Sequence, residues 1–255
     1  MDFKALTREE LYSVIEGCSK AERVPVILNF WVLRDSFGEN KDQVENIIGQ
    51  YMQDVQSIYI ETPKAFDAPD GDSEYRWANY DDPYKDKTYA LDEEVIISDW
   101  EQLDGIIQSF PNPGYKFMFP NNPPPDKRYR LACWFRCIFE MHWQFRGMTN
   151  ALMDYYLYPT EVHRLFSALT DFYIKMIERA KKELNIDGIF TTDDLGTQSG
   201  PFFSPDIFKE FFKPYYKKII EKAHSLGVHF WLHSCGNIEA FLQDFIEIGL
   251  DVIHP

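Results

Sequence analysis

Length, composition and charge limit what this chain of 255 residues can be. Apolar residues make up 45% of it, which fits a folded globular protein and excludes a disordered one. The formal net charge is −15, whereas proteins that bind nucleic acid usually present a basic surface, so no nucleic-acid partner is expected. The sequence contains no signal-peptide pattern, no apolar stretch of membrane-spanning length and no disulfide framework among its four cysteines. We therefore expect a reduced, cytoplasmic protein that has no membrane partner.

Regular elements are sparse in the first half of the chain. Residues 8–20 have the spacing of a short amphipathic helix that ends near Gly17, and residues 41–58 return to helical spacing. Between them, residues 24–31 form an apolar run of strand length. Turn-forming sequence dominates residues 61–125 and predicts a long, loop-rich insertion, for which a lid over the active site and a plain surface excursion are both open.

The second half alternates between helices and strands. Thr160 can cap a long amphipathic helix, which a strand over residues 187–192 follows. Ser204 and Pro205 are typical of an N-cap and a first helical turn, and Gly227 is predicted to end that helix.

Two further strands are predicted over residues 228–233 and 250–254, with a helix between them from Ile238 to Gly249. Strands that alternate with helices predict parallel pairing, and the chain has no glycine-rich nucleotide-binding motif. We therefore predict one domain over residues 1–255 with the (β/α)8 TIM-type barrel fold rather than a doubly wound sheet. About six strands can be counted and the chain ends directly after one, so we expect a truncated barrel that lacks its C-terminal strands.

Polar residues cluster after two of these predicted strands. Asp193 and Asp194 follow one strand, while His233 and Cys235 end the next, so a barrel places all four at one mouth. Imidazole and thiolate suit zinc, although an isolated pair is also compatible with a hydrogen-bonded histidine and a small buried cysteine. A zinc site needs a third ligand, and none is obvious: His254 at the end of the next strand could reach, but a core or exposed histidine is the favoured interpretation of it. One aspartate can act as a general acid or base or anchor substrate while the other shapes the turn.

The apolar segment 131–139 is predicted to be a strand. Cys133 and Cys137 lie on one face of it, which favours core packing for both. Arg136 and Glu140 are charges within and just after an apolar strand, so both require partners.

Several of these motifs together resemble the uroporphyrinogen decarboxylase superfamily, and most of all its corrinoid-dependent zinc methyltransferases. The resemblance is ordered and specific over residues 130–255 and diffuse before them. The residues that carry it are Arg146–Met148, Asp193–Gln198, Ser204–Pro205, Phe211–Tyr215 and His233–Asn237.

The resemblance implies a (β/α)8 barrel, with zinc bound by His233 and Cys235 and by a further cysteine beyond Pro255. It also implies methyl transfer between a small-molecule donor or acceptor and a corrinoid (cobamide) carried on a separate partner protein. We assign catalytic roles to Asp193 and Asp194. Substrate-binding roles are assigned to Glu140, Gln198 and Asn237.

Two alternatives remain open. True uroporphyrinogen decarboxylases carry an arginine-rich loop after their first strand, whereas residues 28–35 here hold a single arginine, Arg34. Decarboxylation of a tetrapyrrole without a cofactor is therefore the second hypothesis, and a non-catalytic tetrapyrrole- or corrinoid-binding protein is the third. Convergence of Arg34, Arg136 and Arg146 on the mouth favours the decarboxylase, and their dispersal into salt bridges favours the methyltransferase.

Overall fold

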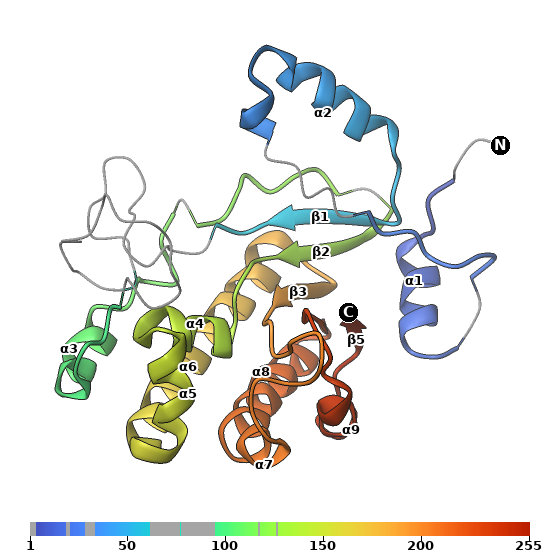
Figure 1. Ribbon diagram of the computed structural model, residues 1–255. Coiled ribbons are helices and arrows are strands. Elements are labelled where there is room, and N and C mark those ends of the chain that lie inside the picture. The colour runs from blue at the N-terminus through green and yellow to red at the C-terminus, as the bar shows by residue number, and fades with distance from the viewer. Residues whose placement is uncertain are drawn as a thin grey trace. The chain divides into compact units, whose positions relative to one another are not determined.

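A computed structural model describes residues 4–18, 21–28, 34–61, 77, 95–116, 118–125 and 127–255 (Figure 1). These residues cluster into two compact units. The N-terminal unit comprises residues 1–57 and 124–131, and the C-terminal unit comprises residues 58–123 and 132–255.

A buried carboxylate organises the N-terminal unit, which contains α1 (Arg8–Ile15), the 3-10 helix η1 (Arg34–Asn40) and α2 (Lys41–Gln50). Asp54 is fully buried, and its oxygens accept hydrogen bonds from the backbone N–H groups of Leu6 and Val26 at 2.7 and 2.6 Å. The guanidinium of Arg23 donates to both oxygens of the same carboxylate at 2.7 Å. Asp54 therefore ties three separate segments together through charge-assisted hydrogen bonds.

The first predicted strand is wrong as far as it can be followed. Residues 24–28 form no strand, and residues 29–31 lie outside the described part of the chain. The strand instead is β1 (Val55–Tyr59), which overlaps the end of the stretch 41–58 that we predicted to be helical. Long-range pairing overrode the local helical spacing here, since the backbone N–H of Ile60, directly after β1, donates to Cys133 at 2.8 Å.

The predicted insertion over residues 61–125 is described only in part. It contains the 3-10 helix η2 (Trp100–Gln102) and α3 (Leu103–Gln108). Residues 62–76 and 78–94 lie outside the description, so a lid there stays a prediction.

From residue 159 onward, helices and strands alternate as predicted, and β2, α4 and α5 precede them. The elements in chain order are β2 (Tyr129–Cys133), α4 (Ile138–Arg146), α5 (Met148–Leu157), α6 (Pro159–Leu184), β3 (Gly188–Thr192), α7 (Pro205–Ile207), the π-helical turn η3 (Phe208–Phe212), α8 (Lys213–Ser225), β4 (His229–His233), α9 (Glu239–Glu247) and β5 (Val252–His254).

The strand order identifies the fold. The described strands form a five-stranded sheet in the order β1-β2-β3-β4-β5, and β4 pairs in parallel with both β3 and β5. In a doubly wound sheet the order reverses at a switch point, whereas in a barrel each strand lies beside its successor in the chain. The chain is thus a partial TIM-type (β/α) barrel, as predicted.

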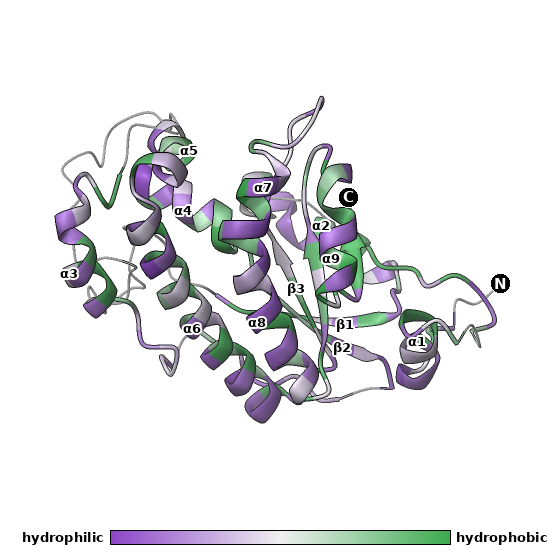
Figure 2. Ribbon diagram, turned by 90° about the horizontal axis from the view of Figure 1, so that it is seen from below, coloured by the Kyte–Doolittle hydropathy of each residue, from purple (hydrophilic) through white to green (hydrophobic). Residues whose placement is uncertain are grey.

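Helices cover the strands of the C-terminal unit through one apolar face each. Helix α6 packs against α8, and in Figure 2 both show hydrophobic residues on one side and hydrophilic residues on the other. Helix α6 begins at Pro159, after Tyr158, rather than after the predicted cap Thr160. Ser204 and Pro205 begin α7 as predicted, since the Ser204 hydroxyl accepts the N–H of Ile207. Among the described residues, no helix is both long and apolar enough to cross a membrane.

Beyond Cys133 the predicted strand over residues 131–139 is also wrong. β2 ends at Cys133, and Cys137 directly precedes α4. Both cysteines are buried in the core and are free thiols, so their predicted packing role is confirmed.

Candidate metal centre

Parallel register brings the carboxyl ends of β3, β4 and β5 together. Thr192 lies opposite His233, which in turn lies opposite His254. Past these pairs, the N–H of Asp193 donates to the carbonyl of His233 at 2.9 Å, and the N–H of Ser234 donates to the carbonyl of His254 at 3.1 Å. The side chains that follow β3 and β4 therefore leave the sheet at one edge, which we call the mouth.

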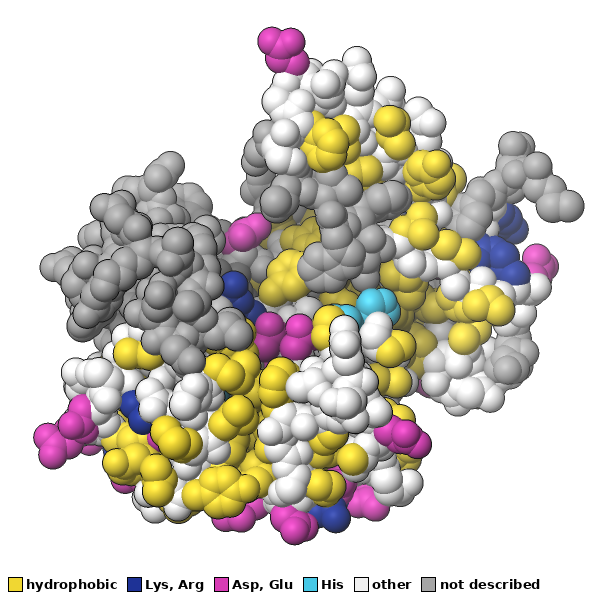
Figure 3. Space-filling view, viewed as in Figure 1, with side chains coloured by type: hydrophobic (Ala, Val, Ile, Leu, Met, Phe, Trp, Pro, Cys, Tyr) yellow, Lys and Arg dark blue, Asp and Glu magenta, His cyan; other side chains and the backbone are white. Residues whose placement is uncertain are grey.

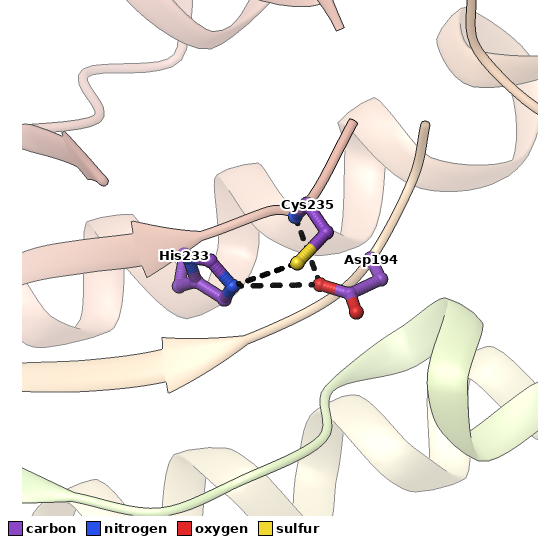
Figure 4. Close-up of side chains that lie close together, drawn as sticks. All are labelled: Asp194, His233 and Cys235. Carbon is purple, nitrogen blue, oxygen red and sulfur yellow. Dashed lines mark hydrogen bonds and ion pairs between the residues drawn. The ribbon is translucent and has the colours of Figure 1, made fainter. Parts of the chain in front are cut away.

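Three potential metal ligands meet at the mouth (Figure 4). Nε2 of His233 lies 3.3 Å from Sγ of Cys235 and 3.7 Å from Oδ1 of Asp194. The same Oδ1 accepts the backbone N–H of Cys235 at 2.9 Å, which holds the two loops in register. All three ligand atoms lie within 4.8 Å of one another. His233 and Cys235 are thus brought together as predicted, and Asp194 joins them.

The spacing and chemistry of this cluster fit zinc. At usual zinc bond lengths, a tetrahedral ion keeps its nitrogen and sulfur ligands about 3.6 Å apart and its nitrogen and oxygen ligands about 3.4 Å apart. The corresponding separations here, 3.3 and 3.7 Å, depart from those values by only a few tenths of an ångström. A mixed set of imidazole, thiolate and carboxylate is one that zinc accepts.

His254 contacts the opposite side of the His233 ring rather than the cluster. Nδ1 of His233 lies 3.0 Å from the carbonyl oxygen of His254 and 2.8 Å from its Nδ1. A proton on Nδ1 of His233 can be donated there, which leaves Nε2 unprotonated and facing Cys235 and Asp194. Metal-binding histidines are commonly oriented by such a hydrogen bond at the other ring nitrogen.

The protein groups around Cys235 by themselves disfavour its thiolate form. Desolvation raises the pKa of Cys235 above its usual value, and the neighbouring charge of Asp194 raises it further. A divalent cation bound by the three side chains would reverse this balance, because a coordinated thiol loses its proton.

Asp193 points inward, away from the exposed surface. It is fully buried, and its oxygens accept the N–H groups of Phe139 and Glu140, at 2.9 and 2.7 Å, in the first turn of α4. The Tyr216 hydroxyl donates to it as well. Burial, followed by the charge of Glu140, raises the pKa of Asp193 to about 8, against the pull of these donors. Asp193 thus caps α4, which explains why α4 begins where a strand was predicted, and its catalytic role stays a prediction.

Glu140 lies between the capping site and the mouth. Its Oε2 accepts the Thr192 hydroxyl at 2.7 Å, and Oγ1 of Thr192 accepts the backbone N–H of Arg136 at 2.9 Å. Burial raises the pKa of Glu140, and the charge of Asp194 adds to the rise, whereas the Thr192 hydrogen bond opposes it. Thr192 was not predicted as a site residue, because an apolar strand with a terminal threonine carries no distinctive pattern.

The other two predicted substrate-binding residues lie on the loops that follow β3 and β4. Gln198 is exposed on the first of these loops. Asn237 is also exposed, but its side-chain oxygen accepts the N–H of Glu239 at 3.1 Å, at the start of α9. Their roles toward substrate stay predictions.

These two loops cross in direct backbone contact at a pair of glycines. A Cβ on Gly236 would lie 2.3 Å from the carbonyl carbon and oxygen of Gly196, and Gly236 has a φ of +83°. Next to the crossing, the N–H of Asn237 donates to the carbonyl of Thr197 at 2.7 Å. Because Gly236 directly follows Cys235, this crossing positions the thiol. The two glycines are visible in the sequence, but their contact is not.

Of the three arginines that we expected to separate the two enzyme hypotheses, Arg146 is held in a buried ion pair. Arg146 is buried, donating to Asp154 through Nε at 2.7 Å and Nη2 at 3.0 Å. Trp100 and the carbonyl of Ile97 complete this ion-pair network. Arg136 is exposed near the mouth, and the side chain of Arg34 lies outside the described residues.

Residues 142–255 match the family model for uroporphyrinogen decarboxylase (URO-D). This match supports the assignment of residues 142–255 to the URO-D superfamily. It contains β3, β4, β5 and all three potential ligands, and it agrees with the barrel topology, since the family is one of TIM barrels. Superfamily members are enzymes that carry out decarboxylation or methyl transfer. No curated protein gives a significant match to the chain.

Proposed function

We propose that this protein is a zinc-dependent methyltransferase that moves a methyl group between a small molecule and a corrinoid carried on a partner protein. The observation that carries the proposal is the cluster of Asp194, His233 and Cys235, in which the histidine nitrogen lies at zinc-like distances from both the sulfur and the carboxylate oxygen. A cofactor-free decarboxylase has no need of such a cluster.

His233 and Cys235 would hold the metal, with Asp194 as a further oxygen donor. Bound zinc supplies Lewis-acid character, which lowers the pKa of an acceptor thiol or polarises a methyl donor. The backbone of His254 orients His233, and the backbone N–H of Cys235 orients Asp194. These contacts leave the three ligand atoms preorganised at the mouth.

Glu140 would contact the substrate in this proposal. It is half-buried beside the mouth, and the Thr192 hydroxyl holds one of its two carboxylate oxygens. The other oxygen is directed by that contact and can accept a hydrogen bond from a bound molecule.

Tetrapyrrole decarboxylation is the second candidate, and the family match favours it by name. A tetrapyrrole with several carboxylates requires several cationic partners. Arg146 already donates two hydrogen bonds to the buried carboxylate of Asp154, so it is not available to bind a substrate carboxylate. Arg136 is then the one described arginine of the three that lies near the mouth, fewer than a polycarboxylate requires, which supports the methyltransferase over the decarboxylase.

Zinc content tests the proposal directly. Elemental analysis of the purified chain should give near-stoichiometric zinc, and a Cys235→Ala variant should lose it. Cys18→Ala is the matched control, because Cys18 is also an exposed free thiol and belongs to the N-terminal unit.

Methyl transfer should then be assayed in both directions, with a methylated corrinoid protein as the methyl donor and with a reduced, unmethylated corrinoid protein as the methyl acceptor. Zinc that persists in Cys235→Ala, or wild-type protein that cannot be loaded with zinc, would refute the proposal. Either result would direct attention to tetrapyrrole binding and decarboxylation.

A further inference from the structure

Arg136 has a backbone conformation that its residue type disfavours. Its φ is +71°, and the other non-glycine residue with a positive φ in the described chain is Asn185, which ends α6 as a left-handed cap. Asparagine tolerates this region, whereas a long side chain such as arginine is strained there by its Cβ. Such strain persists where the surroundings impose it, and it is concentrated at binding and catalytic sites.

The surroundings of Arg136 do impose this conformation. Its N–H donates to the Thr192 hydroxyl at 2.9 Å, and its carbonyl accepts the Tyr173 hydroxyl at 3.0 Å. Thr192 ends β3, and Tyr173 is buried on α6, so the strained residue is attached to two regular elements of the barrel. Glycine would meet the same backbone requirement without strain. The arginine side chain must therefore contribute something that glycine cannot.

The guanidinium of Arg136 is held in one orientation by Gln144, but only some of its N–H donors have an acceptor among the described residues. With the Gln144 amide turned so that its oxygen faces the guanidinium, that oxygen accepts from Nε at 2.9 Å and from Nη1 at 3.0 Å. Within the described part of the chain, no acceptor meets Nη2 and no carboxylate forms an ion pair with Arg136. Arg146 differs sharply, since both its Nε and Nη2 bind the carboxylate of Asp154. The exposed Arg136 is thus held by a neutral amide with donors left over.

Arg136 lies near the candidate metal centre. Its backbone N–H donates to Thr192, which directly precedes Asp193 and Asp194 and donates to Glu140, and the Arg136 charge interacts with that of Glu140. Figure 3 shows acidic and histidine side chains side by side at the centre of the face in view, with a Lys or Arg side chain next to them. In a chain of net charge −15, an anionic ligand needs such a local cation.

We propose that Arg136 binds an anionic group, a carboxylate or another oxyanion, of the small molecule that occupies the mouth. One guanidinium with unused donors matches one oxyanion, through charge-assisted hydrogen bonds. Glu140 feels the charge of Arg136, but its Oε2 is bound by the Thr192 hydroxyl, and within the described residues the two side chains form no ion pair. The inference rests on the proposed function in that the anion belongs to the substrate of that same site.

The test is an NMR titration of the full chain with acetate, methanesulfonate and inorganic phosphate as separate probes. Arg136→Gln should weaken the tightest of these by about tenfold or more, the loss expected for a hydrogen bond to a charged group. Lys182→Gln is the matched control, since it removes the same charge from an exposed position on α6 and should leave the affinity unchanged. Wild-type affinity in Arg136→Gln, an equal loss in Lys182→Gln, or no binding by the wild type would overturn the inference.

Arg136→Gly adds a readout of the strain. Because glycine adopts positive φ freely, this variant should melt at or above the wild-type temperature while losing the anion. A lower melting temperature together with retained binding would contradict both parts of the argument.

Zinc content, measured on the same samples, separates this inference from the proposed function. Arg136→Gln should keep its zinc. If the protein binds no zinc but its anion binding depends on Arg136, the inference is supported and the methyltransferase proposal is refuted. If the protein binds zinc but its anion binding does not depend on Arg136, the methyltransferase proposal is supported and the inference is refuted.

Discussion

Replacing Gly236 with alanine perturbs the loop crossing that positions Cys235. The new Cβ would lie 2.3 Å from two backbone atoms of Gly196, so the loops must separate by about 1 Å to regain van der Waals contact. The positive φ of 83° adds a backbone cost of about 1–2 kcal/mol for an alanine. Neither strain can be relieved by rotating a side chain, since the atoms in conflict belong to the backbone.

A separation of that size acts directly on the metal ligands. Cys235 precedes Gly236, its N–H donates to Asp194 at 2.9 Å, and its sulfur lies 3.3 Å from Nε2 of His233. Disturbing the groups that orient metal ligands typically lowers metal affinity about 10–100-fold, and we expect Gly236→Ala to fall in that range.

The assay is a competition titration of zinc against a chelating dye, with the melting temperature recorded in parallel. Gly200→Ala is the control, because Gly200 lies on the loop that carries Gly196, a Cβ there would meet nothing within 4 Å, and its φ is unstrained. Gly236→Ala that folds and binds zinc with wild-type affinity would refute the claim that the glycine crossing positions the thiol.

Two further predictions concern the buried network around Asp154. Arg146→Met leaves that carboxylate without its bidentate partner and should lower the free energy of unfolding by about 3–5 kcal/mol, measured by urea titration. Arg146→Met combined with Asp154→Leu should recover most of the loss, and a double variant no more stable than the single one would contradict the ion-pair explanation. His142 is fully buried, and its burial holds its pKa below the usual 6.5, so the unfolded chain takes up this proton first and stability falls as pH drops through 6.5. Between pH 6.5 and 5.5, the free energy of unfolding of His142→Leu should therefore fall less steeply with decreasing pH than that of the wild type, by up to about 1.4 kcal/mol per pH unit. An equal slope in the two proteins would show that His142 is protonated in the folded state.

Patterns that depend on a few neighbouring residues were predictable. The apolar spacing of α6, the serine and proline that begin α7, and the strands β3, β4 and β5 all appear where the sequence placed them. Helix α6 buries one apolar face, and β3 and β4 are buried along their whole length, so the local apolar pattern and the burial agree in each case.

Elements whose partners are remote in the chain were predicted badly. The segment 41–58 has helical spacing throughout, yet its end forms β1 because a strand partner lies more than 70 residues away. Residues 138–139 look like the end of an apolar strand but start α4, since the carboxylate of Asp193 binds the first N–H groups of that helix. Neither partner is visible in a local window of sequence.

The sequence by itself determined the fold class, the strand ends that carry chemistry, and the pairing of His233 with Cys235 as candidate zinc ligands. Only the tertiary structure decided how the two adjacent aspartates differ. Asp193 turns inward to cap α4, while Asp194 turns toward His233 and Cys235. The physical reason is that consecutive residues after a strand project in opposite directions, so one side chain meets the core and the other meets the mouth. Which of them does so depends on the register of β3 against β4 and on a helix terminus contributed from more than 50 residues earlier.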